Sequence, residues 1–296
     1  MNAKKPRLGF AGIGLMGLPM STRLLEAGFP LTVWNRSLEK TEGLRAAGAR
    51  VAETPAALAR ESDIVLLSLA DTTVVERVVF DSDGIAEGGR PGMVLVDHSS
   101  IEPAATRAFA ARLDERCGMD WVDAPVSGGV AGAGQGTLAI MAGGEAAMVE
   151  SLRQVMAPLS QRFTHMGPVG AGQLTKVCNQ MIVGCNALVI AEVIALARKA
   201  GIDAGRIPEA LRGGFADSIP LQILGPQMAS DSFEPIKWHV RTLLKDLDTA
   251  TLLSRQEGSA TPMAALGAQL MRTHGGRGYL EKDPATLVRM YLDEEE

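Results

Sequence analysis

Cysteine is scarce in this chain, and its three residues lack the spacings that metal sites and disulfide frameworks require. Two of them, Cys178 and Cys185, are seven residues apart in one apolar segment, where packing in a core is the expected role. Long basic runs are also absent and the net charge is −5, which argues against nucleic acids and anionic membranes as main partners. The sequence therefore predicts no metal site, no nucleic-acid partner and no membrane partner.

No apolar signal segment opens the sequence, since Lys5 and Arg7 lead directly into a short strand-like run, and we expect a cytoplasmic protein. Internal repeats and low-complexity linkers are absent as well. The 296 residues, 46% of them hydrophobic, suffice for two domains and a large core. The 33 glycines and 15 prolines are normal for an α/β protein.

One stretch, residues 170–201, organises the rest of the chain, because it holds no proline and only Gly184 interrupts it. It begins at a glycine pair and ends at Gly201, which predicts a helix of roughly 45 Å that joins two domains. Charges such as Lys176 and Glu192 leave an uncharged run too short to cross a membrane. Since this helix is apolar nearly all round, we expect other elements to cover most of its faces.

The first turns of this helix carry three polar residues on one face. Lys176, Asn179 and Gln180 stand at positions i, i+3 and i+4 and project together into otherwise apolar surroundings. A lysine in such a place has either a partner or a chemical role. The alternative is a surface lysine that snorkels to water near the helix start.

The beginning of the chain has the pattern of a dinucleotide-binding unit. A strand-like run, residues 7–11, precedes a GxGxxG turn, a helical pattern follows to Gly28, and a second strand covers residues 31–34. Glycines there permit a tight turn, the approach of a pyrophosphate and close packing of helix on strand. The alternative is a glycine-rich turn without a ligand. The predicted cofactor-binding turn comprises Gly12, Ile13, Gly14, Leu15, Met16 and Gly17.

The end of the second strand favours NADP over NAD, although NAD remains possible. An NAD site usually has an acidic residue there for the ribose 2′-hydroxyl, whereas this chain has Asn35, Arg36 and Ser37, with Lys40 one turn later. The Arg36 guanidinium suits a 2′-phosphate, and Ser37 offers a hydroxyl. Glu39 is acidic, but it should lie inside the following helix.

Two further apolar strands, residues 63–69 and 93–97, should end at the same sheet edge as the cofactor, which places Leu69 and Ala70 beside it. His98 follows the second of these strands and is a possible proton donor, but we expect a loop residue without a catalytic role. A later strand ends in Pro125-Val126-Ser127-Gly128-Gly129, whose hydroxyl and backbone N–H groups suit a small carboxylate. The remaining predictions are an N-cap at Thr54-Pro55, strands at 137–141 and 162–165, and helices at 145–156, 207–212, 242–256, 263–274 and 284–291.

Four blocks in this order resemble the β-hydroxyacid dehydrogenase family over nearly the whole chain: GFAGIGLMGLPM, DAPVSGG, GAGQLTKVCNQ, and Lys245-Asp246-Leu247. The segments KVCNQMIV, AEVIALARKAGID and LRGGFADS are most similar to the tartronate semialdehyde (2-hydroxy-3-oxopropionate) reductase branch. The resemblance implies an α/β fold with an N-terminal doubly wound Rossmann domain (residues 1–169), a long interdomain helix (170–201) and an all-α C-terminal domain (202–296). It also implies homodimers or homotetramers.

The resemblance assigns roles residue by residue. Lys176 is the implied catalytic lysine, with Asn179 and Gln180 beside it, and Ser100 and Lys245 are implied cofactor contacts. The implied substrate-binding residues are Ser127, Gly128, Gly129, Trp238 and Asp246. Three departures concern the pocket and hence the substrate: Gln180 replaces a second asparagine found in many members, Ala70 a proline and His98 a methionine.

The chemistry agrees with this resemblance. Hydride transfer to a carbonyl leaves an alkoxide that needs a proton and a positive charge, and a lysine whose pKa is lowered by burial provides both. We therefore expect an NADPH-dependent reductase of a small carboxylated semialdehyde, with tartronate semialdehyde first and 3-hydroxyisobutyrate dehydrogenase or glyoxylate/succinic semialdehyde reductase as alternatives. More distant alternatives are 6-phosphogluconate dehydrogenase, whose C-terminal part is longer, imine reductases, which usually lack the lysine, and a non-enzymatic nucleotide sensor.

Overall fold

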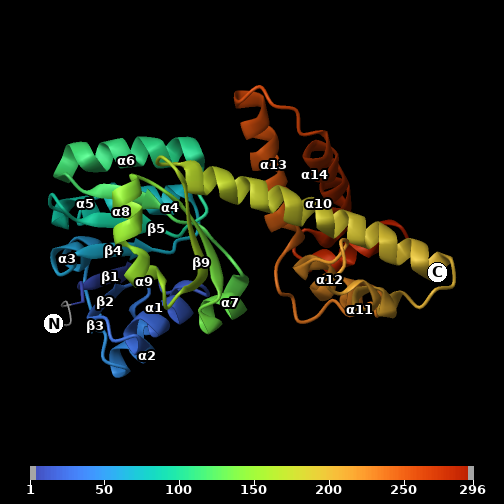
Figure 1. The fold of residues 1–296 in the computed structure, drawn as a ribbon, viewed down its shortest axis with the longest axis horizontal. Helices are drawn as coiled ribbons and strands as arrows, with labels where there is room; N and C mark the ends of the chain where they lie inside the picture. The colour runs from blue at the N-terminus through green and yellow to red at the C-terminus, as the bar shows by residue number, and fades with distance from the viewer. Residues whose placement is uncertain (1–4, 293–296) are drawn as a thin grey trace. The chain divides into compact units, whose positions relative to one another are not determined.

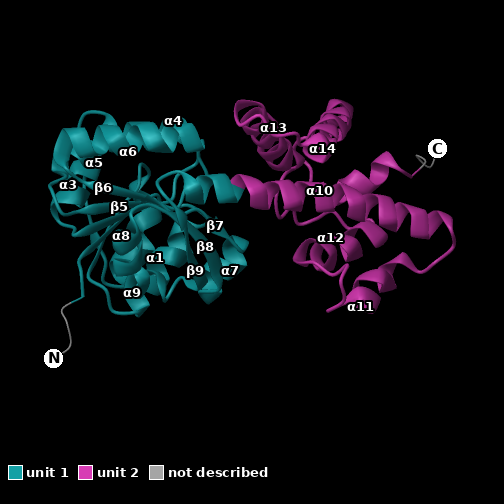
Figure 2. Ribbon diagram, turned by 45° about the horizontal axis from the view of Figure 1, so that its top comes forward, with its two compact units in different colours: residues 1–176 teal, residues 177–296 magenta. Residues whose placement is uncertain are grey.

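The structure, a computed structural model, describes residues 5–292, and the chain divides into two compact units, residues 1–176 and 177–296 (Figure 2). The first unit holds a sheet covered by helices, and the second is built of helices (Figure 1). Helix α10 (Ala171–Lys199) begins in the first unit and continues into the second. The predicted fold class is confirmed, a Rossmann sheet followed by a long helix and a helical C-terminal part.

The sheet of the first unit has the strand order β3-β2-β1-β4-β5-β6-β8-β7, with β9 paired to β8. From β3 to β6 all neighbours are parallel, which is the strand order of dinucleotide-binding folds, and the order reverses between β1 and β4. Strands β6 and β7 both pair antiparallel with β8. The strands are β1 (Leu8–Ala11), β2 (Leu31–Trp34), β3 (Arg50–Val51), β4 (Ile64–Leu67), β5 (Val94–Asp97), β6 (Asp120–Asp123), β7 (Val126–Ser127), β8 (Leu138–Gly143) and β9 (Ser160–Gly167).

Side chains alternate between two cores, one on each face of this sheet. In β4, Leu66 packs into one core, whereas Val65 and Leu67 pack into the other, as the period of two in a strand requires. Both faces are therefore covered, which explains why these parallel strands are continuously apolar. The helices are α1 (Gly17–Glu26), η1 (Leu38–Thr41), α2 (Glu42–Ala46), α3 (Pro55–Arg60), α4 (Thr72–Phe80), α5 (Ile85–Gly88), α6 (Pro103–Cys117), α7 (Gly129–Gln135), α8 (Ala146–Ser151) and α9 (Arg153–Met156).

One prediction about this unit needs correction. The helix predicted over residues 145–156 is divided into α8 and α9 at the buried Leu152, whose ψ of −9° departs from helical geometry. The glycine-rich run after Ser127, for which no helix or strand is predicted from the sequence, forms the short helix α7, beginning at Gly129. The predicted N-cap at Thr54 is confirmed, because its side chain accepts a hydrogen bond from the N–H of Ala57.

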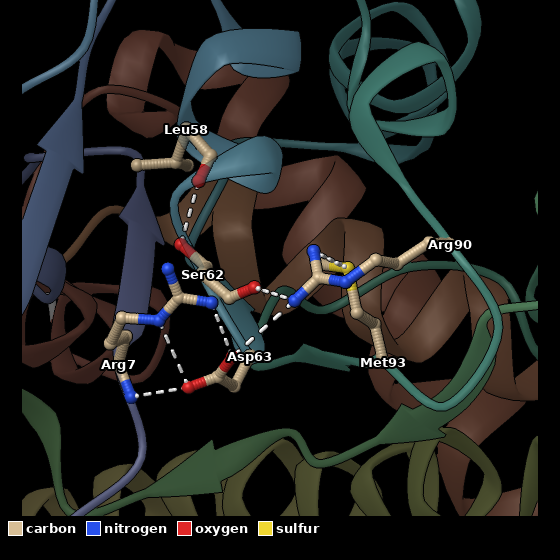
Figure 3. Close-up of polar contacts among 6 residues, drawn as sticks. All are labelled: Arg7, Leu58, Ser62, Asp63, Arg90 and Met93. Atoms are coloured by element: carbon tan, nitrogen blue, oxygen red, sulfur yellow. Dashed lines mark hydrogen bonds and ion pairs between the residues drawn. The ribbon is translucent and has the colours of Figure 1, made fainter.

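The edge of the sheet where the strands begin is held by charged contacts around Asp63 (Figure 3). Arg7, just before β1, donates to both carboxylate oxygens of Asp63, just before β4, at 2.6 and 3.2 Å. Arg90 donates to the carbonyl oxygen of Ser62 at 3.0 Å and reaches Asp63 at 3.4 Å. The arginine partner lowers the pKa of Asp63. This cluster lies at the amino ends of the strands, opposite the edge at which open α/β sheets bind their ligands.

The second unit packs its helices around one core. Its elements after α10 are η2 (Ala204–Arg206), α11 (Ile207–Leu211), α12 (Ile219–Ala229), α13 (Val240–Gln256), α14 (Pro262–His274), η3 (Gly275–Tyr279) and η4 (Pro284–Met290). Helix α12 is missing from the sequence prediction, since it contains two prolines; Ser218 caps its start and Pro226 lies inside it. The predicted helix 284–291 is a 3₁₀ helix.

Helix α10 is less covered than the sequence predicts. Ile182 and Leu196 are 64% and 71% exposed within the described residues, and Val189 and Val193 are exposed beside them on the same helix face. We call these four residues the α10 stripe. By length and composition alone α10 could also cross a membrane, with a mean hydropathy of 1.9 over its most apolar 18-residue window, of which 44% is buried. Buried core helices share this composition, so the property is weak evidence for a membrane.

Candidate functional site

The glycine turn after β1 has the geometry of a pyrophosphate site. Gly12 has a φ of +101°, and a Cβ there would lie 2.2 Å from the carbonyl oxygen of Ser68. A Cβ on Gly17 would lie 1.9 Å from the carbonyl oxygen of Gly12, so only glycine lets α1 start this close to β1. No described atom lies within 4 Å of a Cβ placed on Gly14. The turn is therefore closed toward the protein and open at the position where a pyrophosphate would approach.

Asn35 holds this turn against the end of β2. Its Oδ1 accepts a hydrogen bond from the N–H of Ile13 at 2.9 Å, and its Nδ2 donates to the carbonyl oxygen of Ser37 at 2.9 Å. Asn35 thus fixes both the glycine loop and the segment that carries Arg36. The first turn of α1 contains no acidic residue, so the positive end of its dipole is not opposed there.

A pocket of about 490 Å³ lies beside this turn. Seven residues predicted for cofactor binding line it, namely Gly12, Gly14, Asn35, Arg36, Ser37, Leu69 and Ala70. Arg36 and Lys40 contribute positive charge to its lining, and Arg77 of α4 adds a third cation, with Asp81 also present. Sequence reasoning missed Arg77, although Val74, Arg77, Val78 and Asp81 repeat at helical spacing after the end of β4.

His98 lies in the loop after β5, as the sequence predicts, and it is buried there. Its exposure is 4%, its Nδ1 lies 2.7 Å from the carbonyl oxygen of Ala124, and its Nε2 has no partner among residues 5–292. A carbonyl can only accept, so Nδ1 carries the proton. Burial lowers the pKa of His98 to about 4. The imidazole is therefore neutral at physiological pH, and its one N–H proton is donated to the carbonyl oxygen of Ala124.

Lys176 lies half-buried on α10 at the end of the first unit, and Asn179 and Gln180 follow on the second unit's part of the same helix. Ser127 ends β7, and Gly128 and Gly129 follow it with φ angles of +134° and +62°, so both suit glycine. The remaining predicted residues of the first unit, Leu15, Met16 and Ser100, stand in the glycine turn and after β5.

In the second unit, the amide of Gln180 is bonded on both sides. Its Nε2 donates to Oδ2 of Asp246 at 2.5 Å, and its Oε1 accepts from Nδ2 of Asn179 at 2.8 Å. Lys245 approaches the other oxygen of Asp246 at 3.1 Å. These four predicted residues thus form one chain of contacts between α10 and α13. Trp238 packs against the same unit's core, and its indole N–H is buried without a partner among the described residues.

The three comparisons agree with this arrangement. Residues 7–167 match the family described as the NAD binding domain of 6-phosphogluconate dehydrogenase, and residues 170–291 match that of NADP-dependent 3-hydroxyisobutyrate dehydrogenase. The 2-hydroxy-3-oxopropionate reductase of Escherichia coli strain K12 is 37% identical over 283 residues, which are 96% of each chain. The NAD-dependent L-serine dehydrogenase of Pseudomonas aeruginosa is 33% identical over 96% of this chain and 97% of its own. A solved structure of Mycobacterium tuberculosis 3-hydroxyisobutyrate dehydrogenase with L-serine has a TM-score of 0.86 and 28% identity, over 98% of this chain and 100% of that one.

Proposed function

The chain belongs to the 3-hydroxyisobutyrate dehydrogenase-related family of NAD(P)-dependent β-hydroxyacid dehydrogenases, and we propose that it reduces a small carboxylated semialdehyde with NADPH. The first candidate substrate is 2-hydroxy-3-oxopropionate, the compound for which the E. coli relative is named. One observation carries the proposal: Lys176 stands on the helix whose first turn is bonded to the carboxyl end of β6, the sheet edge where the cofactor is expected.

Different residues of this chain bind the cofactor, donate the proton and hold the substrate in the proposed reaction. Bound NADPH would supply the hydride, with its pyrophosphate at the glycine turn and its ribose phosphate near Arg36 and Lys40. Lys176 donates the proton that the new alkoxide needs, and its charge stabilises that alkoxide before the proton moves. Ser127 and the N–H groups after it hold the substrate carboxylate.

The two amides that follow Lys176 on α10 are assigned a supporting role. Gln180 is held by Asp246 and in turn holds Asn179, so we assign both amides to orienting the lysine and the substrate oxygen. Lys245 and Trp238 are assigned to the cofactor and the substrate, respectively. For the domains we propose the division expected from the sequence: a cofactor domain (1–169), the long helix (170–201) and a helical domain (202–296).

A substrate panel tests this function. NADPH oxidation is followed with tartronate semialdehyde, glyoxylate, succinic semialdehyde and methylmalonate semialdehyde, and oxidation of L-serine and 3-hydroxyisobutyrate is measured in reverse. We expect the highest kcat/KM for tartronate semialdehyde and poor turnover of propanal and butanal, which lack the carboxylate. Ser127→Ala should raise KM more than it lowers kcat. Efficient turnover of the simple aldehydes contradicts the carboxylate site, and no turnover of any compound favours a nucleotide-sensing protein.

We also infer a homo-oligomer, a dimer or a tetramer. The α10 stripe supports it, because four large apolar side chains on one helix face gain about 25 cal/mol per Å2 when a second copy covers them. Leu196→Glu should lower the molar mass seen by light scattering while a substitution of the nearby exposed Lys199 leaves it unchanged. An unaltered mass for Leu196→Glu places the interface elsewhere.

A further inference from the structure

The carboxylate of Asp123 sits on the first turn of α10. Its Oδ1 accepts a hydrogen bond from the N–H of Gly170 at 2.7 Å, and its Oδ2 accepts one from the N–H of Gln173 at 2.8 Å. Asp123 is the last residue of β6 and is fully buried. Both oxygens therefore accept a hydrogen bond, and the carboxyl group faces the positive end of the dipole of a 29-residue helix.

Two glycines allow this close approach. A Cβ on Gly143 of β8 would lie 2.5 Å from Oδ1 of Asp123. A Cβ on Gly172 of α10 would lie 2.4 Å from the carbonyl oxygen of Met141 and 2.6 Å from that of Asp123. The Gly172 contacts are with backbone atoms, and a Cβ on Gly143 would also lie 2.8 Å from the backbone nitrogen of Gly172. A side chain at either glycine would therefore push the first turn of α10 away from the sheet.

Gln173 ties the same turn to the neighbouring strand ends. Its buried amide accepts a hydrogen bond from the N–H of Ile101 at 3.2 Å and donates to the carbonyl oxygen of Ser99 at 2.7 Å. The hydroxyl of Ser99 accepts in turn from the N–H of Leu69, after β4. The start of α10 is thereby connected to the carboxyl ends of β4, β5 and β6.

A second buried carboxyl lies next to the first. Asp97 of β5 is the register partner of Asp123, and both are fully buried. Its Oδ1 accepts from the N–H of Ser99 at 2.9 Å, whereas its Oδ2 has no partner among residues 5–292. Burial raises the pKa of Asp97 to about 7, and the charge of Asp123 adds to the effect. Burial also raises the pKa of Asp123, but its hydrogen bonds from Gly170 and Gln173 favour the ionised form.

We propose that Asp97 and Asp123 form a buried carboxyl pair with one proton, held by Asp97, and that ionised Asp123 is a positioning residue for Lys176. Lys176 is three residues beyond Gln173, so the carboxylate that fixes Gln173 also fixes where the lysine stands on α10. The inference rests on the proposed function, because it takes Lys176 as the proton donor.

Two substitutions of equal size test the pair. Asp123→Asn replaces one of two oxygens that accept hydrogen bonds by an NH2 group, which then faces the N–H of Gly170 or Gln173. In Asp97→Asn the NH2 group can take the place of Oδ2, which accepts no hydrogen bond from residues 5–292. We expect Asp123→Asn to lower kcat about 10–100-fold with KM and the NADPH Kd within about threefold, since small misplacements of a catalytic group cost this much. Asp97→Asn should keep kcat within about threefold. A wild-type kcat in Asp123→Asn overturns the proposal.

A double-mutant cycle separates positioning from general damage. If Asp123 acts through Lys176, adding Asp123→Asn to Lys176→Ala should change kcat by less than about twofold. An equal loss of kcat in both backgrounds overturns the positioning role. If Asp123→Asn does not fold, Gly172→Ala displaces the same turn from the helix side and enters the same cycle.

Hydrogen exchange tests the contact without any turnover. Amides in peptides that cover residues 168–176 should exchange faster in Asp123→Asn than in the wild type, and at the wild-type rate in Asp97→Asn. Unchanged exchange in Asp123→Asn overturns the proposal. If the wild type is inactive on the whole substrate panel, or if Lys176→Ala is fully active, the proposed function is contradicted instead. The hydrogen-exchange result then still tests whether Asp123 holds the first turn of α10.

Discussion

The Nδ1 atom of His98 lies 2.7 Å from the carbonyl oxygen of Ala124, and this contact uses the one proton that the neutral histidine could donate. The only proton of the neutral ring is used in that bond, and burial keeps the pKa of the ring at about 4. Lys176 is then the candidate acid at the end of the cofactor-binding unit.

The first prediction compares these two residues. Lys176→Ala should lower kcat roughly 10²–10⁴-fold while NADPH still binds, as expected for loss of a general acid. His98→Gln keeps an N–H donor for Ala124 and should cost less than about tenfold. It should also leave the pH profile of kcat unchanged between pH 5 and 8, since His98 is neutral throughout. Steady-state kinetics with NADPH titrations measure both, and an inactive histidine variant beside an active lysine variant reverses the assignment.

The second prediction concerns cofactor choice. Arg36→Asp should reverse or flatten a preference for NADPH over NADH, because it removes a guanidinium from the pocket and adds a charge that repels a 2′-phosphate. Arg77→Gln should weaken NADPH binding as well, and a charged hydrogen bond is worth about 1.5–3 kcal/mol, roughly 10–150-fold in Kd. Arg45→Gln, on α2 and outside the pocket, is the control. Equal or better use of NADH by the wild type contradicts the NADP preference.

A third prediction separates two glycines of one turn. Gly14→Ala should fold normally and weaken NADPH binding about tenfold or more, because its methyl group occupies open space where the pyrophosphate would approach. Gly17→Ala should instead lower Tm, since its Cβ meets the backbone of Gly12, and overpacking costs about 1–3 kcal/mol. Thermal unfolding with and without NADPH distinguishes the two, and equal effects on Tm in the absence of cofactor refute the distinction.

Most of the fold could be predicted from patterns among residues that are near neighbours in the sequence. Strand β1, the glycine turn and strand β2 follow from apolar runs and glycine spacing, which depend on near neighbours alone. Helix α12 escaped prediction because its two prolines suggest a break, while tertiary packing and the Ser218 cap stabilise it. The exposed α10 stripe escaped too, since composition shows that a helix is apolar but not what covers it.

Only the parts of the site that consist of residues close together in the sequence could be predicted. The glycine turn and the polar face of α10 are visible in the sequence because their members are neighbours. The burial of His98, the Asp97–Asp123 pair and the contribution of Arg77 depend on strands and helices that are distant in sequence. Register pairing of β5 with β6 creates the carboxyl pair, and no local pattern specifies that register.

The last prediction uses the raised pKa of Asp97. Its carboxyl has a pKa of about 7 when folded and an ordinary value of 3.8, so between pH 4 and 7 the folded chain keeps a proton that the unfolded chain releases. Stability therefore falls as pH rises through this window, by on the order of a few kcal/mol, and the penalty is complete above pH 7. Asp97→Asn removes the titrating group, so it should match the wild type at pH 4 and exceed its stability at pH 8. Urea unfolding followed by tryptophan fluorescence measures this, with the exposed Asp120→Asn on β6 as control. The same difference at both pH values means that Asp97 is ionised in the fold and that the pair does not hold a proton there.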